Sequence, residues 1–369
     1  MNGIIEKKFY DDRYEVTCGV IEECHDMRID LFVQLYFPSF TREFIKKKID
    51  KNQVTILTRI GRVKPSTKIK KWDKIHIVCF RENIEDEYWM NTKIMFEDLS
   101  IIHDHEKFCV TNKPPFMCAH PTGRHVFYCA TVYAERMLGS QCSTVHRLDR
   151  ETSGVLVLSK DAEYGNLLST QFEKHQVQKF YFFIAQAPTN RTIQWPFVAQ
   201  ERIGEDLKGD IHSRLYMQCF PESSTYGKSA KTYFDLIIEG QGFIGGLAMP
   251  KTGRQHQIRT HAAFHGLPLV GDKIYTNGYT MFQKFKDGLA TQEDYEKMML
   301  PRHALHATAI DFLQLNLQPK YFFAPLPLDL LLFVKEKMNI SADDLHEKLK
   351  NKIIEWQHLL KTQELPQPL

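Results

Sequence analysis

Short apolar runs separated by helical stretches are the feature that most constrains the fold of this chain. The runs are rich in β-branched and aromatic residues and are bounded by turn-forming residues, which is typical of strands. They are KFCVTN from Lys107, GVLVLSK from Gly154, KFYFFIAQ from Lys179 and KTYFDLII from Lys231. Helical periodicity lies between them, for example over residues 161–172. This mixture predicts an α+β fold for the larger part of the chain.

A smaller unit is expected near the N-terminus. Apolar residues at i, i+3, i+4 and i+7 predict a helix over residues 29–36, and Thr41 is a candidate N-cap for a second helix. Strands are expected around 54–57 and 74–78. Lysine and arginine side chains line one side of the second helix and continue into the hairpin. Such a pattern fits a solvated face as well as an RNA-binding surface, and both interpretations stay open.

Composition limits the class of protein without naming it. The net charge is only +3, so the overall charge of the chain does not by itself indicate a nucleic-acid partner. Neither a signal peptide nor an apolar run long enough to span a membrane is visible, so we expect a soluble, unsecreted, cytoplasmic protein that does not bind membranes. The eight cysteines form no C-x-x-C pair and indicate reduced thiols.

Two motifs match the patterns of binding sites, but the residues around them argue against nucleotide or zinc binding. GQGFIG, from Gly240, matches a dinucleotide fingerprint, but the glycines and Pro250 that follow it oppose a helix start, so a glycine-rich hairpin turn is expected. His261 and His265 lie at i, i+4 without a glutamate between them or a further ligand nearby, which argues against zinc.

The segment TVHRLDRETSG places Asp149 between Arg147 and Arg150, directly before an apolar strand. Neighbouring guanidinium groups would keep this carboxylate anionic, which suits a nucleophile or a base. By itself the charge pattern favours a structural ion-pair cluster at a strand end. Two further arginine and histidine clusters could converge with it on an anionic substrate such as a phosphate backbone. They are Arg254, His256, Arg259 and His261, and Arg302, His303 and His306.

In these motifs and in their order the chain resembles the RluA-type pseudouridine synthases. HRLDRETSG looks like the family signature, and motifs in the same order surround it: VTNKPPFMCAHPTG, the K-x-Y of KFYFFIAQ, GKSAKTYF, TGRQHQIRTHAAFHGLPLVGDKIY and RHALHA. Residues 28–78 are similar to the small RNA-binding domain of the ribosomal protein S-four type.

This resemblance implies a catalytic fold with a mixed, mainly antiparallel central sheet and flanking helices, plus a small N-terminal α/β RNA-binding domain. It also implies that specific uridines in structured RNA, ribosomal or transfer, are isomerised to pseudouridine by a monomer without metal, nucleotide or other cofactor. The alternative is an RNA-binding or ribosome-assembly protein that keeps the fold without turnover. The expected parts are an extension over 1–25, the RNA-binding domain over 26–82, a linker over 83–95, the catalytic domain over 96–340 and a C-terminal helix over 341–369. The apolar stripe expected on this last helix is Leu345, Leu349, Ile353, Trp356 and Leu360.

The resemblance also assigns roles to individual residues. Asp149 would be the nucleophile, acting at ribose carbon 1′ or by assisting glycosidic cleavage through a glycal, and Arg259 would pair with it. Tyr181 would stack on the flipped uracil and is a candidate acceptor of the carbon 5 proton. The expected substrate-binding residues are His146, Arg147, Lys228, Arg254 and His256. The expected RNA-binding residues of the small domain are Arg42, Lys46, Lys47 and Lys70.

Overall fold

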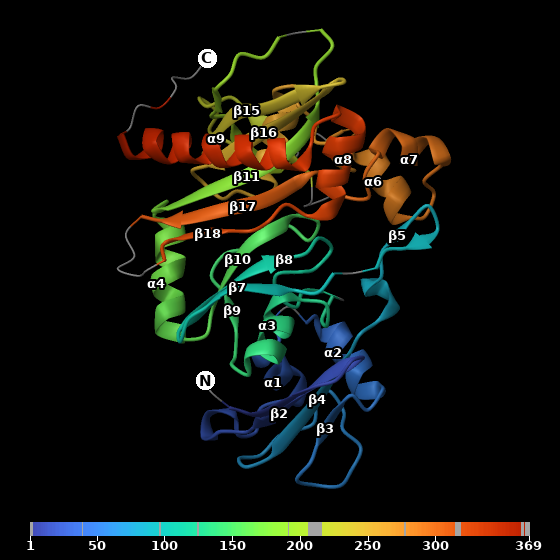
Figure 1. Ribbon diagram of the computed structural model, residues 1–369. Coiled ribbons are helices and arrows are strands. Elements are labelled where there is room, and N and C mark those ends of the chain that lie inside the picture. The colour runs from blue at the N-terminus through green and yellow to red at the C-terminus, as the bar shows by residue number, and fades with distance from the viewer. Residues whose placement is uncertain are drawn as a thin grey trace. The chain divides into compact units, whose positions relative to one another are not determined.

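Figure 1 shows a computed structural model of the protein, which describes residues 3–38, 40–95, 97–123, 125–190, 192–205, 216–276, 278–313, 319–362 and 365. The chain divides into two compact units. The first unit comprises Met1–Tyr88 and Met117–Thr144, and the second comprises Trp89–Phe116 and Val145–Leu369.

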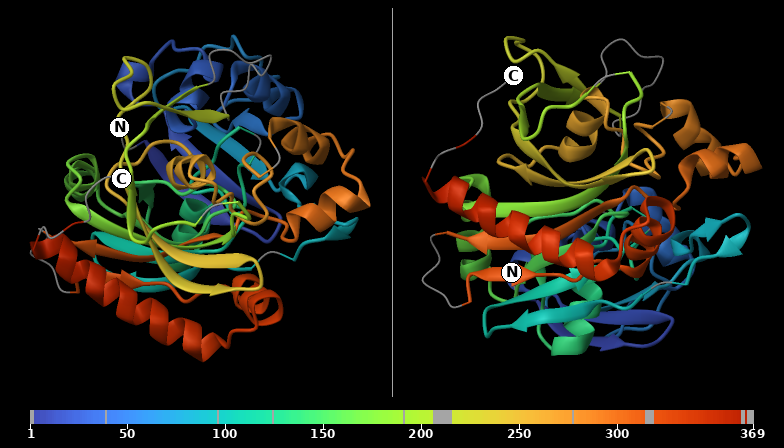
Figure 2. Two further views of the ribbon diagram at one scale, coloured as in Figure 1. Left: turned by 90° about the horizontal axis from the view of Figure 1, so that it is seen from above. Right: turned by 45° about the horizontal axis from the view of Figure 1, so that its top comes forward.

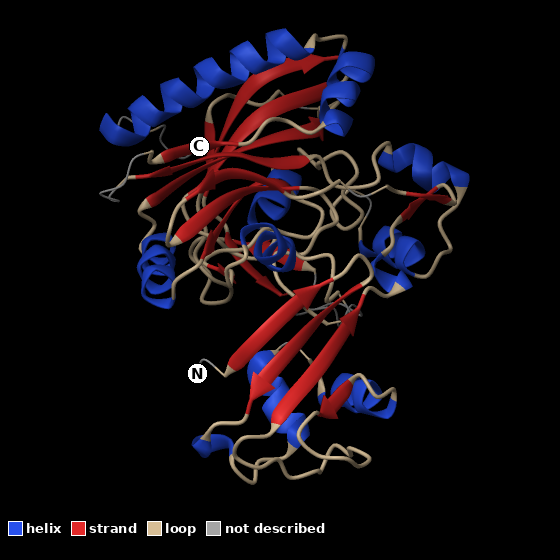
Figure 3. Cartoon of the chain, turned by 60° about the horizontal axis from the view of Figure 1, so that its bottom comes forward, coloured by secondary structure: helices blue, strands red, loops and turns tan. Residues whose placement is uncertain are grey.

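The first unit is built on an antiparallel sheet in the order β1-β2-β4-β3. Figure 3 shows helices packed against one face of this sheet. The elements are β1 (Ile4–Phe9), β2 (Arg13–Gly19), the 3-10 helix η1 (Glu22–Cys24), α1 (Ile29–Tyr36), α2 (Arg42–Asp50), β3 (Val54–Ile56), β4 (Lys74–Phe80), the 3-10 helix η2 (Asn83–Glu85), α3 (Ala130–Leu138) and β9 (Ser143–Thr144).

Local sequence signals explain the two helices that open this unit. The Thr41 hydroxyl accepts a hydrogen bond from the backbone N–H of Phe44 at 3.2 Å, so it caps α2 as predicted. The apolar stripes of α1 and α2 are buried in one core with the alternate residues of β2, β3 and β4. Both helices and both predicted strands of this region are therefore confirmed.

The unit extends beyond the boundaries that the sequence predicted. Strands β1 and β2 belong to its sheet, because β2 pairs with β4 along its whole length, so residues 1–25 are not a separate extension. Phe127 and Val132 lie in the same core. The expected linker contains Glu85, which is buried and accepts backbone hydrogen bonds from Val126, Phe127 and Tyr128. A charged stretch that we interpreted as a linker thus closes the unit.

The second unit is built on a large sheet in the order β12-β15-β16-β11-β17-β10-β8-β7, with β18 beside β17. The pair β10–β17 is parallel, which confirms a mixed sheet. The pairs β12–β15, β15–β16, β16–β11, β11–β17, β17–β18, β10–β8 and β8–β7 are antiparallel, so the sheet is mainly antiparallel, as predicted. The elements are β6 (Thr92–Lys93), β7 (Ser100–Asp104), β8 (Phe108–Lys113), β10 (Ser153–Ser159), α4 (Ala162–Glu173), β11 (Val177–Gln186), β12 (Phe197–Ala199), β13 (Arg202–Glu205), β14 (Met217–Phe220), β15 (Thr232–Gly240), β16 (Phe243–Pro250), α5 (Gln257–Phe264), α6 (Tyr279–Lys286), α7 (Gln292–Met298), β17 (Leu305–Phe312), β18 (Tyr321–Phe323), α8 (Leu328–Met338) and α9 (Ala342–Thr362), while β5 (Tyr88–Trp89) falls on the division between the units.

Helices cover both faces of this sheet, as Figure 2 shows for α9. Four residues of the predicted stripe of α9, Leu345, Leu349, Ile353 and Trp356, are buried together with α8 against alternate residues of β11, β15 and β16, and the fifth, Leu360, is partly buried against the same core. Residues of α5 pack with side chains of the opposite parity on the same strands. This period of two fixes which strand residues reach the α5 side, where Tyr181 packs.

The glycine-rich motif of the second unit is a turn. GQGFIG forms the turn between β15 and β16, where Gln241 and Gly242 have positive φ, and no helix starts there. The eight cysteines form no disulfide. Among the described residues no helix is long and apolar enough to cross a membrane, and no group of three or more potential metal ligands is present.

Candidate active site

Asp149 lies in a tight turn at the start of β10, where its carbonyl accepts a hydrogen bond from the Thr152 N–H at 3.0 Å. The turn is held close to β17 because Gly154, with φ of 111°, lies against Ala307. A Cβ at Gly154 would lie 2.2 Å from the Ala307 carbonyl oxygen, so only glycine permits this approach. The parallel pair β10–β17 therefore fixes the position of the carboxylate.

Arg259 joins two carboxylates from distant parts of the chain. Its Nε and Nη2 donate to Oδ2 and Oδ1 of Asp272 at 2.6 and 2.9 Å, and its Nη1 donates to Oδ2 of Asp149 at 3.0 Å. The side chain of Asp272 is 0% exposed and that of Arg259 6%, whereas that of Asp149 is 28% exposed. The guanidinium is thus anchored to the buried Asp272 and directs one nitrogen to Asp149, the more exposed of the two carboxylates.

This arrangement keeps Asp149 ionised. Burial alone would raise its pKa, but His256 and the Arg259 guanidinium, with the hydrogen bond from Arg259, outweigh burial, and the pKa of Asp149 lies below its ordinary value. The charge that acts at neutral pH is that of Arg259. The pKa of Arg259 is raised, because Asp272 and Asp149 outweigh the cost of its burial. At neutral pH the site therefore holds a preorganised, partly exposed anion.

Histidine and tyrosine side chains surround the carboxylate. His256, with φ of 54°, precedes α5, and its Nε2 lies 3.9 Å from Oδ2 of Asp149. Burial and the nearby Arg259 lower the pKa of His256 to about 4, so the ring is neutral at pH 7. Its Nδ1 lies 3.1 Å from the hydroxyl of Tyr275, and the Arg259 guanidinium lies over the Tyr275 ring at 5.2 Å.

Tyr181 comes from the middle of β11, between β16 and β17. A register shift against β17 falls between Phe180 and Tyr181, the kind of bulge that re-aims a strand side chain next to a site. Burial and the negative charge of Asp149 raise the pKa of Tyr181, so the phenol is neutral and lies within electrostatic reach of the carboxylate. An anion and a flat phenol ring therefore share one site.

The sequence interpretation missed a supporting layer behind Asp149. Glu151 bonds Lys273 Nζ at 2.8 Å and the backbone N–H of His303 at 3.2 Å, and His303 Nε2 lies 2.7 Å from the Thr152 hydroxyl. With Asp272, these residues tie the Asp149 turn to the segment after α5. Asp272 stands in the matched segment LVGDKIY and Glu151 in the signature itself, but neither motif shows that these acids balance Arg259 and Lys273.

Known proteins resemble this chain in sequence. The model of the RNA pseudouridylate synthase family matches residues 107–264. An RNA pseudouridine synthase of Zymomonas mobilis is 32% identical over 207 residues, which are 52% of this chain and 80% of that protein. The chain belongs to the RNA pseudouridylate synthase family. This synthase is an isomerase, and its homologues convert uridine in RNA to pseudouridine.

Further relatives cover more of the synthase. Ribosomal large subunit pseudouridine synthase D of Buchnera aphidicola is 28% identical over 325 residues, 84% of this chain and 94% of that one. Synthase C of the same organism is 29% identical over 318 residues, 83% and 92% of the two chains. The solved structure of human RNA pseudouridylate synthase domain containing 1 has a TM-score of 0.50 at 20% identity, over 69% of this chain and 95% of that one, and shows the same fold.

The predicted substrate-binding residues of the synthase take different positions. His256 adjoins Asp149, as described above, and Arg147 is exposed on the same turn. Arg254 directs its Nε to the Ser229 carbonyl at 2.8 Å, and Lys228 has an exposed side chain while its backbone pairs with Ile203. The contact of Arg254 with Ser229 links the loop before α5 to the segment that follows Gly227.

His146 of the synthase has a partner of another kind. Its Nε2 accepts the Val157 N–H at 3.0 Å, and its ring stacks on Phe172 with centroids 4.3 Å apart. Burial lowers the pKa of His146 to about 3, so the ring is neutral. These contacts make His146 a support of the turn and of β10, and its contact with a nucleotide stays a prediction.

The third basic cluster was interpreted wrongly. Arg302 is fully buried, with Nε and Nη2 on the carboxylate of Asp329 at 2.7 and 3.0 Å and Nη1 directed at backbone carbonyls. His306 is also buried, between the Ser153 hydroxyl and the Ala324 carbonyl. Their donors serve the fold and do not face an RNA phosphate, because internal acceptors already occupy them.

In the first unit, the predicted RNA-binding residues Arg42, Lys46 and Lys47 lie on α2 and Lys70 lies in the loop before β4. All four side chains are exposed. Lys47 pairs with Glu43 at 2.9 Å across one turn of α2. Neighbouring Lys48 is buried and bonds Gln53 and the Val78 carbonyl, so it is excluded from such a surface.

Proposed function

We propose that the enzyme isomerises specific uridines of structured RNA through Asp149 as its nucleophile, and that ribosomal RNA is its first candidate substrate. The pairing of a partly exposed Asp149 with a buried, doubly engaged Arg259 is the single observation that carries the assignment. Two relatives that match over more than four fifths of this chain are named for the large ribosomal subunit. Transfer RNA is the second candidate.

The chemistry assigns a task to each group. The bond between ribose carbon 1′ and N1 of uracil breaks, a bond from carbon 1′ to carbon 5 forms, and carbon 5 loses its proton while N1 gains one. The Asp149 carboxylate assists the first step by attack at carbon 1′ or by glycosidic cleavage through a glycal; both routes need it ionised. Arg259 keeps it ionised and fixes its direction.

Tyr181 serves the base rather than the sugar in this proposal. A flipped uracil must leave its stack at a cost of a few kcal/mol, and an aromatic ring offsets part of that cost. The hydroxyl of Tyr181 is the proposed relay for the proton of carbon 5: because the phenol is neutral, it takes up this proton only as it passes its own proton on, and N1 of uracil is the group that gains one. Arg147, Arg254, His256 and Lys228 would hold the extruded nucleotide and its phosphates.

We further propose that the first unit binds RNA in the manner of the ribosomal protein S-four type. The support is a pair of helices followed by strands β3 and β4, with four exposed cations on α2 and on the loop before β4. Such cations add affinity that depends on salt and on RNA backbone rather than on base sequence.

The test is release of tritium from RNA labelled at carbon 5 of uridine. The purified enzyme is incubated separately with large-subunit ribosomal RNA and with transfer RNA, and release is compared with mapping of pseudouridine in cells with and without the gene. Release from ribosomal RNA supports the proposed substrate. Binding of RNA without any release would show the alternative, an inactive RNA-binding or ribosome-assembly protein.

A further inference from the structure

Trp72, in the turn that leads into β4, is placed where folding gives no reason for a tryptophan. Its side chain is 77% exposed, although tryptophan is normally buried over most of its surface. The Trp72 ring is not part of the core of the first unit, to which β4 contributes Ile75, Ile77 and Cys79 and the helices contribute their apolar stripes. The ring therefore contributes little burial to the fold.

The backbone makes the choice of residue more unusual. Trp72 has φ of 72°, in the left-handed region that favours glycine and strains a bulky side chain. The turn is imposed by its neighbours: the Trp72 N–H donates to the Val20 carbonyl at 3.1 Å, and the Lys70 N–H donates to the Asp73 carboxylate at 2.7 Å. Strain that is kept at an exposed position is a sign of function.

The surroundings of the ring are cationic. Lys71 lies over the Trp72 ring at 5.1 Å and pairs with Glu22. Between Leu57 and Lys74 the single acid is Asp73, which is buried and pairs with Arg59 at 2.6 Å. The basic residues of this loop are Arg59, Arg62, Lys64, Lys68, Lys70, Lys71 and Lys74.

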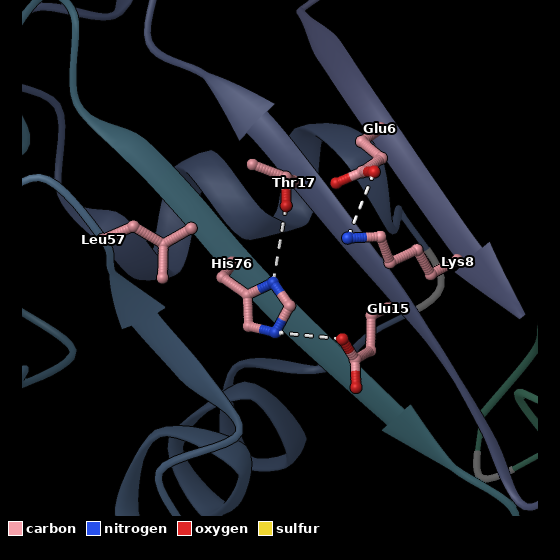
Figure 4. A pocket seen from close by; sticks show the side chains of 6 residues that line it. All are labelled: Glu6, Lys8, Glu15, Thr17, Leu57 and His76. Carbon is pink, nitrogen blue, oxygen red and sulfur yellow. Dashed lines mark hydrogen bonds and ion pairs between the residues drawn. The ribbon is translucent and has the colours of Figure 1, made fainter. Parts of the chain in front are cut away.

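A pocket of the first unit that is lined by Leu57 and by residues of β1, β2 and β4 has a different character. Figure 4 shows it on the sheet face of the first unit, where Lys8 pairs with Glu6 and the ring of His76 lies between Thr17 and Glu15. Its two carboxylates would repel phosphate, so the pocket does not suit RNA. The exposed aromatic and the cationic loop do.

We propose that Trp72 is a stacking platform for an unpaired base of the RNA substrate, with the cations of the 57–74 loop holding the adjoining phosphates. The inference rests on the proposed RNA binding of the first unit and adds that the bound element contains an unpaired nucleotide. Every base has a face that stacks on an aromatic ring, whereas a base inside a duplex is not available to it. The combination of ring and cations is that of single-strand recognition.

The experiment measures dissociation constants of the full-length enzyme for a hairpin RNA with an unpaired loop and for a blunt duplex of equal length. We expect Trp72→Gly to raise the dissociation constant for the looped RNA by about five- to a hundredfold, the range for one lost base stack. We expect a much smaller change for the duplex, and Trp72→Phe to stay closer to wild type. Leu57→Ala, which alters an exposed apolar residue of the pocket in Figure 4, is the matched control.

Stability and fluorescence separate stacking from folding. Because glycine is favoured at φ of 72°, Trp72→Gly should melt no lower than wild type. Looped RNA should quench a component of the tryptophan emission that Trp72→Phe lacks. Wild-type affinity of Trp72→Gly for looped RNA would overturn the stacking role. If the variant of Lys46, Lys47 and Lys70 lost affinity in the same assay, the proposal that the first unit binds RNA would still stand. If neither variant changed affinity, the proposed RNA binding of the first unit would itself fail.

Discussion

The two units hold their positive charges in opposite ways. In the second unit, Arg259 is 6% exposed and its nitrogens are committed to Asp149 and Asp272. In the first unit, Arg42, Lys46 and Lys70 extend from the surface into solvent. A buried charge with fixed partners sets geometry and pKa, whereas solvated charges attract a polyanion and are screened by salt. Chemistry and substrate capture are therefore expected to respond to different perturbations.

The largest effect should come from Asp149→Asn. The amide has nearly the same shape and keeps Arg259 bound to Asp272, so the fold and RNA affinity should survive. Without a carboxylate, no nucleophile remains, and tritium release should fall below detection. The rate and the dissociation constant are measured on the same preparation. A variant as fast as wild type would remove Asp149 from the mechanism.

The hydroxyl of Tyr181 is tested next. Tyr181→Phe keeps the ring and should leave KM nearly unchanged, while kcat falls by about 10²- to 10⁴-fold if the hydroxyl handles the proton of carbon 5. Steady-state kinetics separate the two parameters. A kcat within a few-fold of wild type would restrict Tyr181 to stacking, and Tyr181→Leu, which removes the ring, should then raise KM.

Removal of the Arg259 charge should change stability and the pH profile. Arg259→Gln leaves the buried carboxylate of Asp272 without a counter-charge, with only the backbone N–H groups of Ile274 and Tyr275 as donors. It should cost about 3–5 kcal/mol, most of which Arg259→Gln with Asp272→Asn should recover. The free energies of unfolding of Arg259→Gln, Asp272→Asn and the double variant, each compared with wild type, measure this coupling. Equal losses in the single and double variants would contradict it.

The double variant also tests the electrostatics of Asp149. The pKa of Asp149 is lowered in the folded enzyme, so wild-type activity is lost only as pH falls far into acid. Without Arg259, only His256 and His303 remain to oppose burial, and the pKa should rise. The acidic limb of kcat should therefore move to higher pH. An unmoved limb would assign the ionisation of Asp149 to other groups.

The smallest effect is expected in the first unit. Changing Lys46, Lys47 and Lys70 to Gln should weaken RNA binding and flatten the log–log salt dependence by about one unit or less per lost phosphate contact. Exposed Lys335, Lys337 and Lys350 of α8 and α9, changed to Gln together, match the charge change. Equal slopes for the two variants would mean that the face on α2 is only solvated.

Sequence predicted the parts of this protein that depend on local patterns. The helices capped at Thr41 and packed through Trp356 have the predicted periods, and the matched motifs predicted the pair of Asp149 with Arg259, which the structure brings to 3.0 Å. Strand β1 does not alternate polar and apolar residues, and the alternation of Tyr14, Val16 and Cys18 in β2 was not recognised before the pairing of β2 with β4 was known.

Buried charges were the other limit. Arg302 and His306 carry the residue types of a phosphate site, and only their burial and their internal acceptors show that they serve the fold. Asp272 was missed for the converse reason, since an acid distant from Asp149 along the chain gives no sign that both share one guanidinium. Residue type predicts a possible function, and burial decides between binding and structure.

The most direct test of this division is the single-turnover rate of isomerisation as a function of RNA concentration, compared between Asp149→Asn and the variant of Lys46, Lys47 and Lys70. The account predicts no detectable rate for Asp149→Asn even when RNA saturates the enzyme. It predicts that the lysine variant is slow at low RNA and approaches the wild-type limit at saturation. Recovery of Asp149→Asn at high RNA, or a lysine variant that stays slow at saturation, would contradict it.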